Sequence, residues 1–215
     1  MDKILNINKK SIGTNLAAVS GKNVKIDPEF HYDNWARKYE NELLNEYGYC
    51  AHIIASEALL KHETRKDCEI IDIGCGTGLV GEELKSSGFL NIWGLDVSSK
   101  MIAIAKKKQI YREFYQKKIE NLEGIISKPF DALICVGSFG LGHIGPESIE
   151  LLVKLVKKNS PIIIFMNAEP FNLENYMDYI EDLNKQNLIN IVDIQDHNYM
   201  TKLDRPGKLI IFRRN

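Results

Sequence analysis

The sequence predicts an α/β fold in which a seven-stranded, mostly parallel sheet is doubly wound, with helices on both faces. Two observations support this class. Short apolar segments alternate with amphipathic ones from residue 69 onward, which is the pattern of successive strand–helix units. The last two apolar segments are separated by a polar loop instead of a helix, so they should pair as an antiparallel hairpin at the C-terminal end.

The individual elements follow from apolar content and spacing. The segments expected to form strands are Glu69–Ile73, Asn91–Leu95, Tyr111–Gln116, Asp131–Val136, Pro161–Met166, Leu188–Ile194 and Lys208–Arg213. The segments expected to form the intervening helices are Leu79–Ser87, Ser99–Lys108, Pro146–Lys158 and Leu173–Asn184.

The N-terminal part differs in character from this core. Residues 1–28 lack periodicity and are rich in Asn, Lys, Ser and Gly, which predicts a flexible tail. The remainder, residues 29–215, is expected to form one domain. Within it, residues 29–65 should form a helical lid and residues 66–215 the core.

Two helices are predicted in the lid. From Phe30, large apolar residues recur at intervals of three and four until Gly48 ends the pattern. A second helix should cover Ala51–His62.

Composition excludes several classes of protein. The chain has 215 residues, of which 44% are hydrophobic and 27% charged, as in soluble globular proteins. The net charge of −1 gives no reason to expect a nucleic-acid or membrane partner, and no apolar run is long enough to span a bilayer. The default expectation is a cytoplasmic protein, monomeric or homodimeric.

The four cysteines, at 50, 68, 75 and 135, form no C-x-x-C pair, so buried reduced thiols are expected and no metal site. Cys75 lies inside a glycine-rich turn, where a nucleophilic role is an alternative. No histidine lies near it in sequence to activate the thiol.

The glycine-rich turn follows the first predicted strand, with Gly74, Gly76 and Gly78 at alternate positions behind Asp72. Two ligands compete for such a turn. The run from Gly76 to Gly81 matches the dinucleotide pattern G-x-G-x-x-G, and an acid follows Gly76 after 20 residues, where a ribose-binding acid is expected.

Asp72 favours a different ligand. A carboxylate at the strand end would repel a pyrophosphate, whereas it suits the α-ammonium of an amino-acid moiety, directly or through water. S-adenosylmethionine carries such an ammonium, one ribose and no phosphate. Asp96, at the end of the next strand, could accept hydrogen bonds from both ribose hydroxyls. The alternative for Asp96 is a helix N-cap, a role that Ser98 or Ser99 could fill equally well.

Four stretches resemble class I S-adenosylmethionine-dependent methyltransferases, and in particular the methyltransferase-like group from the Williams-Beuren chromosome region with its bacterial relatives. These stretches are the Tyr-Asp-x-Trp-Ala-x-x-Tyr run at 32–39, Gly-Cys-Gly-Thr-Gly-Leu-Val-Gly at 74–81, Tyr-x-x-x-Tyr-Gln at 111–116 and Gly-x-x-x-x-Gly-His at 137–143. The resemblance implies a Rossmann-like fold and S-adenosylmethionine as cofactor, with S-adenosylhomocysteine as product.

The residues expected to bind this cofactor come from the turn, the strand ends and the lid. They are Tyr39, Asp72, Gly74, Cys75, Gly76, Thr77, Gly78, Asp96, Val97, Ser98, Met101, Lys118, Ile119, Val136 and Gly137. One position departs from the group. Lys118 stands where relatives have an acid that reaches the adenine amino group, and lysine cannot accept that hydrogen bond. Either Glu120 replaces the acid, or main-chain groups bind the adenine.

Several residues are candidates for contact with the substrate. His143 is the best candidate for a general base, with a structural role before the helix at Pro146 as the alternative. Tyr39 and Trp35 could cover the cofactor with aromatic faces, or pack in the core. Four residues of the predicted hairpin loop, which could be solvated or touch substrate, are His197, Tyr199, Asp204 and Arg205.

The sequence therefore predicts a methyltransferase acting on an O, N or S nucleophile of a small molecule, or less favourably of a protein side chain. A catalytically silent cofactor-binding protein that acts through a partner is the alternative. An NAD(P)-dependent oxidoreductase is a more distant one.

Overall fold

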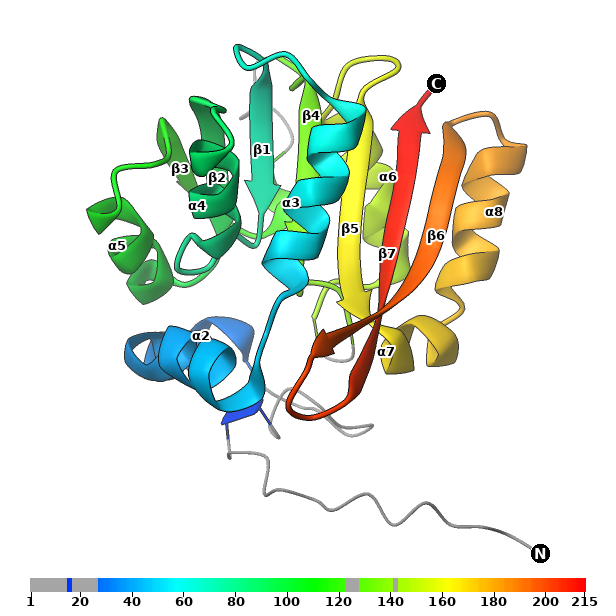
Figure 1. The fold of residues 1–215 in the computed structure, drawn as a ribbon. Coiled ribbons are helices and arrows are strands. Elements are labelled where there is room, and N and C mark those ends of the chain that lie inside the picture. Colours follow the sequence, from blue (N-terminus) through cyan, green and yellow to red (C-terminus); the bar gives the residue numbers. More distant parts are fainter. Residues whose placement is uncertain (1–14, 17–26, 123–127, 141–142) are drawn as a thin grey trace, which may run out of the picture.

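In the computed structural model, which describes residues 15–16, 27–122, 128–140 and 143–215, the centre of the molecule is a seven-stranded sheet in the order β3-β2-β1-β4-β5-β7-β6 (Figure 1). The first five strands are parallel, and β7 runs antiparallel between β5 and β6. The strands are β1 Glu69–Ile73, β2 Asn91–Asp96, β3 Glu113–Gln116, β4 Ala132–Val136, β5 Pro161–Asn167, β6 Ile189–Met200 and β7 Arg205–Arg214. This confirms the predicted fold class.

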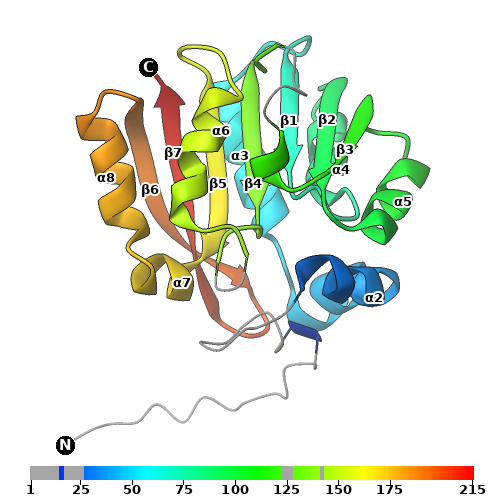
Figure 2. The same ribbon diagram turned by 180° about the vertical axis from the view of Figure 1, so that it is seen from behind.

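Helices cover both faces of the sheet. Figure 1 shows α3 and α4 in front of it, and Figure 2 shows α6 and α8 on the opposite side. The helices are α2 Pro28–Glu40, η1 Asn41–Tyr47, α3 Ala51–His62, α4 Leu79–Ser86, α5 Ser99–Lys107, η2 Ile119–Asn121, η3 Pro146–Ser148, α6 Ile149–Lys154, α7 Ala168–Leu173 and α8 Tyr176–Lys185. No helix within these described ranges is long and apolar enough to cross a bilayer.

Each face of the sheet has its own apolar core, because successive side chains of a strand point to opposite sides. In β1, Ile70 packs in the core on the α3 and α4 side, and Ile71 packs in the core on the α6 and α8 side. The central strands are buried on both faces, which explains why they read as nearly continuous apolar runs.

Several predicted boundaries were wrong. The helix predicted over Leu173–Asn184 corresponds to α8, which begins at Tyr176, and the preceding α7 was not predicted. Asn175 separates the two helices by adopting a left-handed conformation with φ 56°. The helix predicted over Pro146–Lys158 ends at Lys154. Strand β6 continues to Met200 and β7 begins at Arg205, because the two strands pair up to that point. His197, Tyr199 and Arg205 therefore lie in strands and not in the predicted loop.

The predicted lid is smaller than expected. Of the helices in the described residues 29–65, α2 and η1 lie across the carboxyl ends of the parallel strands (Figure 1), whereas α3 packs against the sheet and contributes Ala55 and Leu59 to its core. Asp27 caps α2 by accepting a hydrogen bond from the Glu29 N–H at 3.1 Å. Most of the predicted tail lies outside the described residues, but Leu16 is buried against the core.

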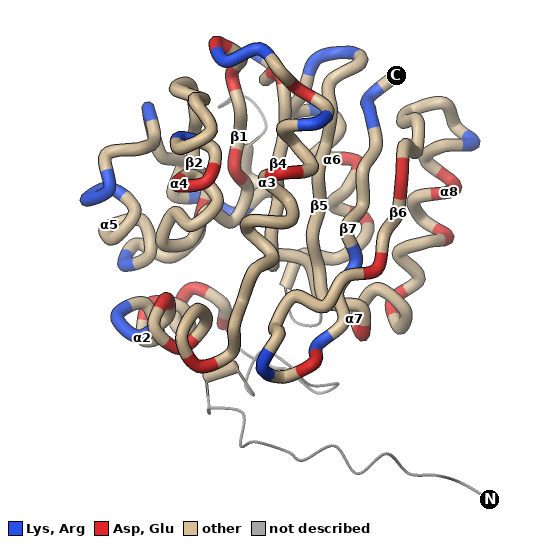
Figure 3. Tube along the Cα trace, in the orientation of Figure 1, with Lys and Arg blue, Asp and Glu red and all other residues tan. Residues whose placement is uncertain are grey.

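Charged residues of both signs are interspersed along the described part of the chain (Figure 3). This distribution agrees with the net charge of −1.

Candidate functional site

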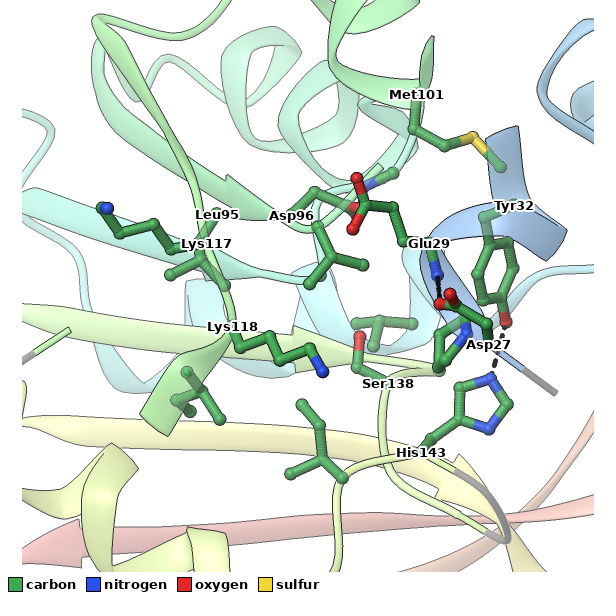
Figure 4. A pocket seen from close by; sticks show the side chains of 18 of the residues that line it. Asp27, Glu29, Tyr32, Leu95, Asp96, Met101, Lys117, Lys118, Ser138 and His143 are labelled. Carbon is green, nitrogen blue, oxygen red and sulfur yellow. Dashed lines mark hydrogen bonds between the residues drawn. The ribbon is translucent and has the colours of Figure 1, made fainter. Parts of the chain in front are cut away.

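A cavity of about 300 Å³ lies between the carboxyl ends of the parallel strands and α2. It is located beside β1 and β4, where the strand order reverses direction and open α/β sheets bind their ligands. Figure 4 shows side chains from the strand ends, the lid and the loop after β4 converging on it. The predicted site residues that line the cavity are Tyr39, Gly74, Gly76, Asp96, Val97, Met101, Lys118, Ile119, Val136, Gly137 and His143.

The glycine-rich turn uses its own N–H groups internally. The N–H groups of Gly74 and Cys75 both donate to the Leu95 carbonyl, at 2.7 and 2.9 Å, and the N–H of Gly78 donates to the Cys75 carbonyl at 2.8 Å. The N–H of Gly76 donates to Asp96 Oδ2 at 2.8 Å. A phosphate-binding turn needs such donors to point at its ligand, so this hydrogen bonding argues against a pyrophosphate.

Gly74 explains how the turn approaches the cavity so closely. Its φ of 69° lies in the left-handed region, and a Cβ there would collide with the Ser138 hydroxyl. Only glycine therefore lets the turn pass beneath the loop that follows β4.

Asp96 lies in the cavity wall with its carboxylate held by the backbone. Besides the bond from Gly76, Oδ1 accepts a hydrogen bond from the Ser98 N–H at 2.8 Å. Burial raises the pKa of Asp96, and the bonds from Ser98 and Gly76 oppose that shift. Ser98 itself caps α5, accepting from the Met101 N–H at 3.1 Å. Asp96 is therefore not the helix cap, and each of its oxygens keeps a lone pair for a ligand hydroxyl.

Asp72 does not line the cavity. Its side chain is only 1% exposed, since it points to the same face of the sheet as Ile70, towards α4. Asp72 Oδ2 accepts a hydrogen bond from the Tyr111 hydroxyl at 2.7 Å, and Oδ1 has no partner within the described part of the chain. Burial raises the pKa of Asp72 to about 7, although the bond from Tyr111 lowers it. Asp72 therefore makes no direct contact with the cavity in which the ligand was expected. Its Oδ1 remains an unused hydrogen-bond acceptor behind the turn.

Four other predicted residues, Cys75, Thr77, Gly78 and Ser98, lie behind the cavity wall instead of lining it. Burial raises the pKa of the Cys75 thiol, so the structure favours an inert buried thiol there over a nucleophile. In the described ranges, no group of three or more His, Cys, Asp or Glu side chains could hold a metal ion.

The cavity wall at the end of β3 is made of exposed side chains. Lys118 precedes η2, and Figure 4 shows its ammonium reaching into the cavity. It has no ion-pair partner among the described residues. Glu120 lines the same end, so the carboxylate that the sequence suggested as a replacement is at hand.

Comparison with known proteins identifies the domain. Residues 70–159 match the model of a methyltransferase domain. A protein of Geobacillus sp. (strain WCH70) with a methyltransferase name is 36% identical over 109 residues, which cover 48% of this chain and 43% of that protein. The chain thus contains a segment that is similar to methyltransferase domains. It spans between 43% and 61% of the length of the first relatives that it matches.

Solved structures agree in fold. Magnesium protoporphyrin IX methyltransferase of Synechocystis PCC 6803, solved with bound S-adenosylhomocysteine, has a TM-score of 0.63 and 16% identity, covering 86% of this chain and 94% of that one. A structure named as a cyclase is almost as similar, with a TM-score of 0.61 and 13% identity over 85% of this chain and 96% of that one. The shared fold therefore does not by itself fix the reaction.

The lid is attached to the core by charged side chains. Asp33 of α2 accepts hydrogen bonds from the Ser98 hydroxyl at 2.6 Å and from the Lys100 N–H at 3.0 Å, both at the start of α5. At the other end of α2, the ammonium of Lys108 contacts Glu40 at 2.5 Å and Glu82 at 2.6 Å. These contacts hold α2 over the cavity.

Sequence reasoning missed several residues that line the larger cavity, chiefly Asp27, Glu29, Tyr32 and Ser138. The Tyr32 hydroxyl lies 3.1 Å from His143 Nε2, at hydrogen-bond distance (Figure 4). Tyr32 opens the aromatic run at 32–39 that carried the family resemblance, and this was the one signal that could have revealed it.

Proposed function

We propose that this chain transfers the methyl group of S-adenosylmethionine to a small molecule. Asp96 is the observation that carries the proposal. Its carboxylate faces the cavity, is oriented by backbone donors at 2.8 Å, and lies beside a turn in which the N–H groups of Gly74, Cys75, Gly76 and Gly78 are already used. That arrangement suits a ribose diol without a pyrophosphate.

The remaining residues divide the cofactor between them. The turn at Gly74 and Gly76 would receive the methionine end, with the free oxygen of Asp72 able to reach the ammonium through water. Met101 and Ile119 offer apolar surface for the base. When bound, the cofactor supplies an electrophilic methyl group.

The protein mainly excludes water and orients the nucleophile. The lid residues Tyr32 and Tyr39 line the cavity and shield it from solvent. Burial raises the pKa of Tyr32, so this phenol stays protonated beside His143. His143 is then placed to take a proton from the acceptor, with Tyr32 orienting its ring.

A small acceptor is favoured over a protein side chain. The cavity lies beneath α2, which is held to α5 by Asp33 and to α4 by Lys108 and Glu82. A protein side chain would need this lid to open, whereas a small molecule can be enclosed. Membership of the Williams-Beuren region group remains a proposal on the residues that suggested it.

The test is calorimetry of the purified chain with S-adenosylmethionine, S-adenosylhomocysteine and NADH. We expect the first two ligands to bind and NADH not to bind. Transfer of a labelled methyl group to small molecules of a cell extract would follow. Absence of binding by both sulfur ligands contradicts the proposal, and binding without transfer to any extract component supports the silent binding protein.

A further inference from the structure

A second, smaller cavity of about 90 Å³ adjoins the cofactor cavity. Four residues line both of them, namely Tyr32, Tyr39, Gly137 and His143. A molecule in the small cavity would therefore meet the contents of the large one at the candidate base.

The walls of the small cavity are largely aromatic. Three rings come from α2, those of Tyr32, Trp35 and Tyr39, and the rings of Trp35 and Tyr39 meet edge to face with centroids 4.9 Å apart. Opposite rings come from Tyr49 and Tyr199, whose centroids are 5.8 Å apart, and from Phe165. The faces of such rings are electron-rich and attract cations.

The charges of the residues that line the small cavity also favour a cation. Among its described residues there is no lysine or arginine, and the single carboxylate is that of the exposed Glu169. An anionic acceptor would lose its hydration here without gaining a cationic partner. A cation would keep favourable contacts with the rings and the carboxylate.

Hydrogen-bonding capacity is also available at the walls. The hydroxyls of Tyr39, Tyr49 and Tyr199 make no hydrogen bond within the described part of the chain, whereas the Trp35 N–H is already bonded to Glu42 at 2.7 Å. A methyl group on the Cα of Gly137 would lie 3.5 Å from the Tyr49 hydroxyl. The Tyr49 oxygen therefore lies close to the border between the two cavities. These phenol oxygens can accept N–H bonds from a ligand.

We infer that the small cavity takes an amine, and that the chain methylates the nitrogen of a small primary or secondary amine. This inference rests on the proposed methyltransferase function. The amine binds as an ammonium and first gives a proton to His143 or water. The neutral amine then uses its lone pair to form the new N–C bond, and the electron pair of the broken C–S bond stays on sulfur. The positive charge thus passes from sulfur to nitrogen, and the nitrogen then loses its proton to His143 or water. The aromatic walls therefore face a positively charged ammonium before and after the transfer. An anionic nucleophile would instead place a negative charge against them.

Three probes of equal size and different charge test this choice: n-butylamine, 1-butanol and butyrate. Each is titrated into the protein saturated with S-adenosylhomocysteine, and binding is followed by NMR chemical shifts. We expect butylamine to bind about 10-fold more tightly than butanol, and butyrate not to bind. With labelled S-adenosylmethionine, the label should appear on the nitrogen of butylamine.

Variants of Tyr49 test whether the amine binds in the small cavity, because this residue lines the small cavity and not the large one. Tyr49→Leu should weaken butylamine binding about 5-fold, and Tyr49→Phe, which keeps the ring, should weaken it less. Both should bind S-adenosylhomocysteine as the unchanged protein does. Tyr179→Leu, a control on α8, should change neither affinity.

The inference is overturned if butanol or butyrate binds as tightly as butylamine, if none of the three binds the loaded protein, or if Tyr49→Leu binds butylamine normally. Loss of S-adenosylhomocysteine binding by the unchanged protein would instead remove the proposed function itself. The two failures are therefore distinguishable.

Discussion

The two ends of the cofactor cavity are built in different ways. At the end formed by β1 and β2, the wall is backbone and one carboxylate, and the hydrogen bonds of the turn at Gly74 and Gly76 fix their positions. At the end formed by β3 and η2, the wall carries exposed charged side chains, including Lys118 and Glu120. The first end is rigid because its donors and acceptors are paired within the protein. The second can change its chemistry by a single substitution without disturbing the fold.

The largest effect is expected from Asp96→Asn. The asparagine side chain accepts hydrogen bonds only at its oxygen, because its other terminal atom is an NH₂ donor. It therefore cannot accept from both hydroxyls of a diol while also accepting from the Gly76 N–H. Calorimetry should show about 100-fold weaker binding of S-adenosylhomocysteine, as for the loss of one or two hydrogen bonds to a charged group. Asp178→Asn on α8 is the matched control. An affinity within 3-fold of the unchanged protein would mean that Asp96 does not bind the ribose.

Asp72→Asn should separate stability from binding. The pKa of the folded Asp72 is raised from 3.8 to about 7, so the protein holds this proton more tightly when folded. The stability that Asp72 contributes is fully present below about pH 4. It is lost as the pH rises from about 4 to about 7, by at most about 4 kcal/mol. The variant lacks this ionisation, and asparagine can still accept the bond from Tyr111.

Thermal unfolding at pH 8 should therefore show a higher Tm for Asp72→Asn, and the difference should shrink towards pH 4. Binding of S-adenosylmethionine should weaken about 10-fold, because the carboxylate proposed to reach its ammonium through water is gone. A lower Tm at pH 8 would show that the buried charge has a compensating partner. Unchanged binding would show that Asp72 serves only the fold.

Asp33→Ala tests the lid. This change removes the acceptor for the Ser98 hydroxyl and the Lys100 N–H, so α2 loses its attachment to α5. S-adenosylhomocysteine should bind about 5-fold more weakly, since Tyr32 and Tyr39 would be less firmly placed. Hydrogen exchange should rise in α2 and stay unchanged in α6. Exchange that rises equally in both helices would indicate general destabilisation.

The smallest effects on ligand affinity are expected at the end of the cavity formed by β3 and η2. Lys118→Glu supplies a carboxylate that could accept from the adenine amino group, and should strengthen S-adenosylhomocysteine binding about 3-fold at this exposed position. If Glu120 already makes that contact, Glu120→Gln should weaken binding by a similar factor. A gain from the first variant with no effect of the second favours main-chain binding of the adenine. Weaker binding by Lys118→Glu would show that the lysine itself contributes.

The cavity itself was only partly predictable, as three residues illustrate. Asp96 could be placed from the sequence, because it ends a parallel strand and Ser98 was available as the helix cap. Asp72 was correctly placed at a strand end, but the face to which it points was not, since that depends on Tyr111 and α4. Tyr32 was missed because its partner, His143, is 111 residues away.

The sequence by itself determined the alternation of strands and helices, the C-terminal hairpin and the turn that opens the site. These features depend on local periodicity and on glycine, which act within a few residues. Only the tertiary structure decided that β7 lies between β5 and β6, that α2 covers the cavity while α3 packs on the sheet, and that α2 and β6 contribute to one aromatic pocket. Such contacts join segments that are distant in the chain, and they are set by how whole elements bury their apolar faces against one another.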